Sequence, residues 1–169
     1  MKAIVDKTKL DDRFRDLKTS ALNDAEKGSL LALALKVLSA RHHRGRTLAS
    51  PNDTQAYLRL RLADKQAELF GCLYLDNRHR VLELCELFHG TIDGTSVYPR
   101  VVVQQALTVN AAAVILFHNH PSGVAEPSQA DERITRRLKS ALELIDVRVL
   151  DHFIVAAGDS VSMAARGIL

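Results

Sequence analysis

The sequence lacks the long apolar runs and the cysteine pairs that characterise several large classes of protein. No stretch approaches the roughly 18 consecutive apolar residues of a membrane helix, and the run from Ala111 to Phe117 has the length of a buried strand. The two cysteines, Cys72 and Cys85, belong to no Cys-x-x-Cys pair. We therefore expect no membrane span, and we interpret both cysteines as small buried side chains rather than as metal ligands or a disulfide.

An export signal is also missing from the N-terminus. The first residues, Met1 to Lys7, contain neither an apolar signal core nor a small-residue cleavage site. The expectation is a cytoplasmic protein, in which thiols stay reduced.

Charge of one sign is not in large excess, because the formal net charge is only +3. Two short basic clusters, Arg41 to Arg46 and Arg133 to Lys139, have no interleaved aromatic residues, which favours a solvated surface over a nucleic-acid footprint. Internal repeats and low-complexity tracts are absent too. With 47% apolar and 25% charged residues, the 169-residue chain has the profile of one globular domain with an appendage.

The N-terminal part is predicted to be helical. The run from Ala25 to Leu38 is rich in leucine and alanine and has no proline, which is typical of one good helix. The stretch from Arg41 to Asp53 interrupts this pattern with glycine, serine and proline, and a second helix is expected from Ser50 to about Leu62. We predict a helical N-terminal segment and linker over residues 1–46, and a main domain over 47–169.

The main domain alternates short apolar runs with helical patterns. Strands are expected at residues 68–75, 81–88, 111–117, 147–155 and 161–164. Helices are expected at residues 99–110 and after residue 128, where apolar residues recur at helical spacing to Ile145. This order predicts an α/β fold with a mixed sheet flanked by helices.

One segment carries the pattern of a metal site. His118 and His120 stand at i and i+2 where an apolar strand ends, so both imidazoles can project to the same side. Ser128 can cap the next helix, which places the carboxylate of Asp131 at the third helical position. Three such ligands and one water make an open zinc site. Singly, the histidines would be surface or core residues and Asp131 a capping residue; together they favour a metal site.

A hydrolase also needs a base near its water. The candidates in or near the core are Glu68, Glu83, Glu86 and Glu126. Glu68 stands out because it begins an apolar strand, where an uncompensated carboxylate would be costly, although a solvated strand end explains it equally well. Asp151 and His152 are either partners of the ligating imidazoles or structural hydrogen-bonding residues, and the structural role is the preferred interpretation.

The stretch from His118-Asn119-His120-Pro121 to Pro127-Ser128-Gln129-Ala130-Asp131 resembles the signature of the JAMM (MPN+) metalloproteases. From about Ser50 onward the chain resembles the bacterial RadC family, long labelled as DNA-repair proteins. The segments that carry this wider resemblance are Tyr74-Leu75-Asp76-Asn77, Phe88-His89-Gly90-Thr91, Val97-Tyr98-Pro99-Arg100 and Leu150-Asp151-His152-Phe153-Ile154-Val155.

The resemblance implies zinc bound by His118, His120 and Asp131, with water as the fourth ligand. It implies that Glu68 acts as general base on that water and that Ser128 helps to stabilise the oxyanion. The implied fold is an α/β sandwich resembling the cytidine deaminases, an MPN (JAB) domain with a short helical N-terminal extension.

Two departures from the family pattern are visible. Val101 follows Pro99-Arg100 where the RadC pattern usually has a glutamate, at a position away from the metal ligands. The helical part before Ser50 is shorter than the helical domain of full-length RadC proteins and is more like the compact relatives found in mobile elements.

The leading hypothesis is a zinc metalloprotease or hydrolase that cleaves a peptide or isopeptide-type amide in a protein or peptide substrate. The alternative is a DNA-repair-associated nucleic-acid-binding factor with a structural or vestigial zinc site, using Arg41, Arg44 and Arg46. A partner-binding module would not need the full ligand set. An HNH nuclease is excluded because its ligands are dispersed on a ββα unit, and a zinc deaminase is excluded because it needs a Pro-Cys-x-x-Cys pair.

Overall fold

The computed structural model describes residues 17–48, 50–62, 65–91 and 95–169. The segment from Met1 to Lys7, on which the expectation about export rests, lies outside the described residues. The helices are η1 (Thr19–Ala21), α1 (Asp24–Ser39), α2 (Pro51–Leu62), α3 (Pro99–Thr108) and α4 (Gln129–Glu143). The strands are β1 (Leu69–Leu75), β2 (Val81–His89), β3 (Ala113–Asn119), β4 (Arg148–Ala156) and β5 (Asp159–Ser162).

The chain divides into two compact units, Met1–Ala34 and Leu35–Leu169. In the first unit, Asn23 and Glu26 exchange side-chain-to-backbone hydrogen bonds that cap the start of α1, and the predicted helix is confirmed. The domain boundary between residues 46 and 47 stays a prediction. Within the described ranges, no helix combines the length and apolar character needed to cross a membrane.

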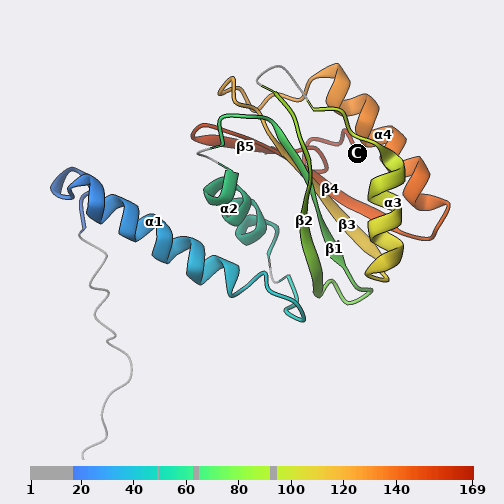
Figure 1. Cartoon of the computed structure of the whole chain (residues 1–169), viewed down its shortest axis with the longest axis horizontal. Helices are drawn as coiled ribbons and strands as arrows, with labels where there is room; N and C mark the ends of the chain where they lie inside the picture. The colour runs from blue at the N-terminus through green and yellow to red at the C-terminus, as the bar shows by residue number, and fades with distance from the viewer. Residues whose placement is uncertain (1–16, 49, 63–64, 92–94) are drawn as a thin grey trace, which may run out of the picture. The chain divides into compact units, whose positions relative to one another are not determined.

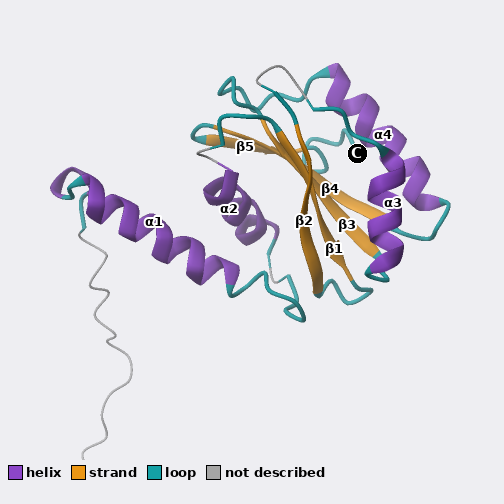
Figure 2. Ribbon diagram, in the orientation of Figure 1, coloured by secondary structure: helices purple, strands orange, loops and turns teal. Residues whose placement is uncertain are grey.

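The second unit is built on a five-stranded sheet in the order β2-β1-β3-β4-β5. β3 and β4 pair in parallel, and every other neighbouring pair is antiparallel, so the predicted mixed sheet is confirmed. Figure 1 shows α2 on one face of this sheet and α3 with α4 on the other, and Figure 2 shows the same helix–sheet–helix layering.

Alternation along the strands decides which side chain meets which helix layer. Residues Leu73 and Phe117 pack on the α2 face, whereas Cys72 and Leu116 pack on the face covered by α3 and α4. All seven residues of β3 are buried, as expected for a central strand with both faces covered. His118 has the same parity as Leu116 and therefore lies on the α4 side.

The end of β3 differs from the prediction. The strand continues through His118 to Asn119, whereas the sequence pattern placed His118 in the following loop. The reason is pairing with the parallel neighbour, because the ladder between β3 and β4 runs on to Asn119 opposite Val155. His118 is therefore held by the sheet itself. Likewise, α4 ends at Glu143, before Ile145, and β5 begins and ends earlier than predicted.

The segment interpreted as a linker is tied to the β1–β2 hairpin. The Gly45 amide donates to the Val81 carbonyl at 2.7 Å, and the Val81 amide donates back to Arg46 at 2.8 Å. Thr47 then forms a β-bridge with Arg80. These bonds attach the basic stretch to the end of the sheet that lies away from His118.

Candidate metal centre

Two histidines from one strand end project into the same space. His118, only 1% exposed, lies on the α4 side of β3. The amide of His120 donates to the Val155 carbonyl at 2.8 Å, which extends the strand geometry by one step. The side chains at i and i+2 therefore share a side, as the sequence predicted.

The intervening Asn119 side chain makes contacts that the sequence analysis missed. Its Oδ1 accepts from the Leu69 amide at 2.8 Å, and its Nδ2 donates to the carbonyls of Lys65 and Ala67. These bonds tie the segment just before β1 to the end of β3. The sequence signal for these contacts was the position of Asn119, whose amide side chain stands between two histidines at the end of an apolar strand.

The third member of the cluster comes from the first turn of α4. The Ser128 hydroxyl accepts from the Asp131 amide at 3.1 Å, and the Ser128 amide donates to Asp131 Oδ2 at 2.7 Å. This is the predicted capping box, with Ser128 as N-cap and Asp131 at the third helical position. The Ser128 hydroxyl also lies 2.6 Å from Asp131 Oδ2, so the cap orients the carboxylate.

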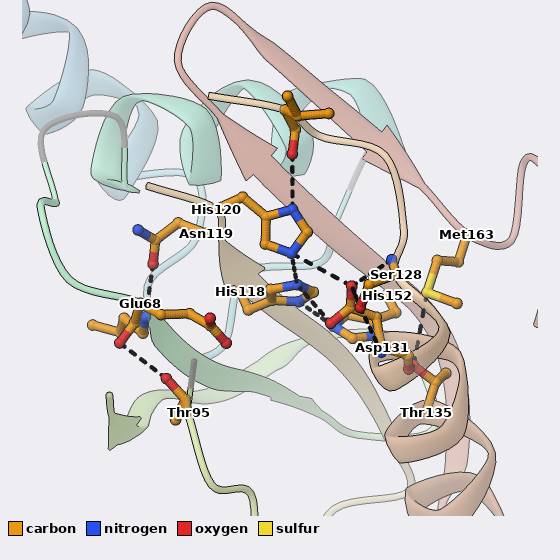
Figure 3. A network of polar contacts seen from close by, with 12 residues as sticks. Glu68, Thr95, His118, Asn119, His120, Ser128, Asp131, Thr135, His152 and Met163 are labelled. Carbon is orange, nitrogen blue, oxygen red and sulfur yellow. Dashed lines mark hydrogen bonds and ion pairs between the residues drawn. The ribbon is translucent and has the colours of Figure 1, made fainter. Parts of the chain in front are cut away.

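The three side chains converge at a single point, as Figure 3 shows. His118 Nε2 lies 2.9 Å from His120 Nε2 and 3.2 Å from Asp131 Oδ1. His120 Nε2 lies 3.4 Å from Asp131 Oδ2. Such a group of two imidazoles and a carboxylate could hold a metal ion.

The ionised carboxylate of Asp131 and the two imidazoles make this cluster suitable for binding a cation. His120 Nδ1 lies 2.8 Å from the Val124 carbonyl, which only accepts, so the Nδ1 proton is committed there and the Nε2 lone pair faces inward. Although burial opposes ionisation, the neighbouring imidazoles of His118 and His120 hold the pKa of Asp131 well below its usual range. Contact with Asp131 also raises the pKa of His120, because a proton taken up at its Nε2 lies beside the carboxylate. Nε2 of His120 and the carboxylate of Asp131 can therefore share either a proton or a metal ion.

Of the four glutamate candidates, only Glu68 lines the cavity of about 530 Å³ beside the cluster. In Figure 3 its carboxylate points toward His118. The other three have partners elsewhere: Gln105 donates to Glu83 at 2.8 Å, Arg61 pairs with Glu86 at 2.7 Å, and Arg166 pairs with Glu126 at 2.6 Å.

The backbone of Glu68 is held on both sides. Its amide donates to the Thr91 carbonyl at 3.1 Å, and its carbonyl accepts from the Gly90 amide at 2.8 Å and from the Thr95 hydroxyl at 3.1 Å. Glu68 directly precedes β1, one residue before the strand begins. The carboxylate is therefore carried by an ordered backbone beside the histidines.

Asp151 and His152 differ in their roles. Asp151 bonds the Ser162 hydroxyl and the amides of His152 and Ala164, which is the structural role that the sequence analysis favoured. For His152 that preference was wrong, because its Nε2 lies 2.8 Å from Nδ1 of His118. Burial, together with the nearby His118, lowers the pKa of His152 well below its usual range, so this imidazole is neutral.

Further residues around the centre escaped the sequence analysis. Thr135 is 2% exposed and bonds His152 behind the cluster. Phe70, Val97 and Ile134 form apolar parts of the cavity wall. Thr135 could have been found from the sequence, because it is a polar residue within the apolar face of α4, four residues after Asp131. The wall residues come from β1, from the segment before α3, and from α4, and no local pattern joins them.

Most of this chain is similar to known proteins. Residues 48–168 match the family model described as RadC-like JAB domain. A UPF0758 protein of Stutzerimonas stutzeri is 59% identical over 143 residues, which make up 85% of this chain and 64% of that protein. One of Halorhodospira halophila is 55% identical over 145 residues, 86% of this chain and 65% of that protein. One of Vibrio cholerae is 56% identical over 140 residues, 83% of this chain and 88% of that protein. The chain thus spans just under two thirds of the first two relatives.

Proposed function

The chain belongs to the RadC-like JAB domain family, and from its site we propose that it is a zinc-dependent metallohydrolase that cleaves peptide or isopeptide-type amide bonds. The observation that carries the proposal is the convergence of His118, His120 and Asp131 beside Glu68 in one cavity. The substrate is a protein or peptide. We also propose that the enzyme acts in the cytoplasm.

The donor set supports zinc as the metal. Imidazole nitrogen and carboxylate oxygen are typical zinc donors, and three protein ligands leave one position open for catalysis. Zinc bonds of roughly 2.0–2.1 Å in a tetrahedron separate neighbouring ligand atoms by about 3.3 Å. The distances of 2.9, 3.2 and 3.4 Å between the side chains bracket that value.

The chain's own residues then divide the work. Zinc at this position supplies Lewis-acid chemistry, polarising a carbonyl and lowering the pKa of a water toward about 7. Glu68 takes the proton from the attacking water and returns it to the leaving amine. Ser128 orients Asp131 through its cap, and we propose that its hydroxyl also reaches the oxyanion. The apolar wall of Phe70, Val97 and Ile134 excludes water from the scissile bond.

Elemental analysis of the purified protein is the first test. About one zinc per chain is expected, and the double variant His118→Ala/His120→Ala should lose it. A protein that takes up no zinc at neutral pH would overturn the proposal at its first step.

Turnover of a fluorogenic peptide and isopeptide library is the second test. Glu68→Gln should retain zinc and lose hydrolysis by 100-fold or more, on the order of a lost general base. Glu126→Gln is the matched control, because it makes the same change at a glutamate paired with Arg166 outside the cavity. Wild-type turnover by Glu68→Gln would refute the assignment of Glu68.

A second candidate function, nucleic-acid binding, is favoured by one observation. The bridge between Thr47 and Arg80 brings two basic segments together at the end of the sheet away from the metal cluster. The exposed arginines gathered there are Arg44, Arg46, Arg78, Arg80 and Arg148. A polyanion bound at this end would show affinity that falls steeply with salt.

The test is binding of a labelled DNA duplex at low and high salt. Replacing Arg41, Arg44 and Arg46 by glutamine should weaken binding and flatten the salt dependence. Replacing Arg133, Arg137 and Lys139 on α4 by glutamine also removes three exposed positive charges, but elsewhere, and is the control. Equal binding by both variants, or none by the wild type at low salt, would reject this function.

A further inference from the structure

Behind the group formed by His118, His120 and Asp131, away from the cavity, a chain of buried polar contacts links His118 to α4. His118 Nδ1 lies 2.8 Å from His152 Nε2, and His152 Nδ1 lies 2.6 Å from the Thr135 hydroxyl. That hydroxyl donates to the carbonyl of Asp131 at 2.5 Å. The exposed fractions of the three side chains are 1%, 0% and 2%, so water cannot replace any of these contacts.

This chain of contacts begins at one residue of the candidate metal site, His118, and ends at another, Asp131. Asp131 provides the backbone carbonyl at one end of the chain and, through its side chain, a metal ligand at the other. Two ligands from different elements, β3 and α4, are thereby connected through a third element, β4, which carries His152. Figure 3 shows His152 between His118 and Thr135.

The contacts also have a direction. Because the Thr135 hydroxyl gives its proton to Asp131, its oxygen accepts from His152 Nδ1–H. A neutral imidazole carries one N–H, so His152 Nε2 is an acceptor and His118 Nδ1 must donate to it. The proton of His118 is then committed to Nδ1, and its Nε2 lone pair faces the other ligands.

We propose that Thr135 and His152 are positioning residues, which hold His118 in the one tautomer and ring orientation that can bind the metal. This inference rests on the metal site of the proposed function, but it makes no use of hydrolysis. If the chain ran in the opposite direction, His118 Nε2 would carry a proton 2.9 Å from His120 Nε2 and would be blocked as a ligand. The direction of the chain therefore decides whether the three side chains form a metal site.

Zinc titration against a competing chelator tests the proposal. Thr135→Val leaves the buried His152 N–H without an acceptor, and a loss of roughly 10- to 100-fold in zinc affinity is expected from losing such a partner. Thr135→Ser keeps the hydroxyl and should bind zinc with most of the wild-type affinity. This variant can be measured even if Thr135→Val fails to fold.

Thr54→Val is the matched control. Thr54 is also fully buried, and its hydroxyl lies 3.3 Å from Nε2 of the buried His42, but on the α2 side of the sheet. It should bind zinc like the wild type. Equal zinc affinity of the wild type, Thr135→Val and Thr54→Val would overturn the proposal, as would equal losses in both valine variants.

Nitrogen-15 spectra of the zinc-bound wild type give a second readout, which a merely structural role would not predict. Both His118 and His152 should be observed with the proton on Nδ1. A proton on Nε2 of His152 would show that the chain runs the other way and would overturn the proposal. Neither readout needs a substrate, so a failed search for hydrolysis leaves this test intact.

Discussion

Gly71→Ala should destabilise the sheet, although it adds only one methyl group. Gly71 lies in β1 opposite Phe117 of β3, next to an irregularity in the pairing with β2. A Cβ atom at this position would lie 2.5 Å from the carbonyl oxygen of Cys85 and closer still to the Phe117 ring. Real Cβ atoms essentially never approach other atoms within 3.0 Å, so one of these neighbours must move.

The magnitude follows from which neighbour can move. The Cys85 oxygen belongs to the backbone of the β1–β2 ladder, and the Phe117 ring is fully buried in the central strand. Overpacking of this kind costs about 1–3 kcal/mol, and with both neighbours fixed we expect a cost near 3 kcal/mol. For a chain of this size that corresponds to a fall in Tm of about 6–12 °C.

Differential scanning calorimetry measures this effect, with Gly28→Ala as the matched control. The added methyl of Gly28→Ala meets nothing within 4 Å, and replacing a glycine inside α1 should gain about 0.5–1 kcal/mol of local helix stability. The Tm of the sheet unit should stay unchanged in that variant. A Tm for Gly71→Ala within about 2 °C of the wild type would refute the packing argument.

Two further predictions concern protonation. The metal-free protein should be most stable near pH 6.5. The pKa of His120 is raised in the folded state, so its contribution to stability is lost as the pH rises through that pKa. The pKa of His152 is lowered in the folded state, so stability is also lost as the pH falls below 6.5. Thermal unfolding across pH 5–9 checks this prediction, and a steady rise in stability from pH 6.5 to 9 would contradict it. The two cysteines should react slowly with a thiol reagent at neutral pH, because burial raises the pKa of Cys85 to about 11 and that of Cys72 further. The half-buried Cys85 should react before the buried Cys72, and the reverse order, read by mass spectrometry, would speak against this packing.

The parts of the site that could be predicted are those that depend on short separations along the chain. His118 and His120 share a side because extended backbone has a period of two. Ser128 and Asp131 meet because a helix N-terminus brings positions three apart together. Both arrangements follow from local backbone geometry, so the residue spacing is sufficient to predict them.

The remaining parts depend on strand pairing between distant segments. Glu68 lies fifty positions before His118, and its place beside the histidines depends on β1 pairing with β3, where Phe70 stands opposite His118. Glu68 stood out among the four candidate glutamates because it begins an apolar strand, but only the tertiary structure places the other three in contacts elsewhere. His152 reaches His118 because β4 lies parallel to β3. Such partners are chosen by the register of the whole sheet, which no short window of residues encodes.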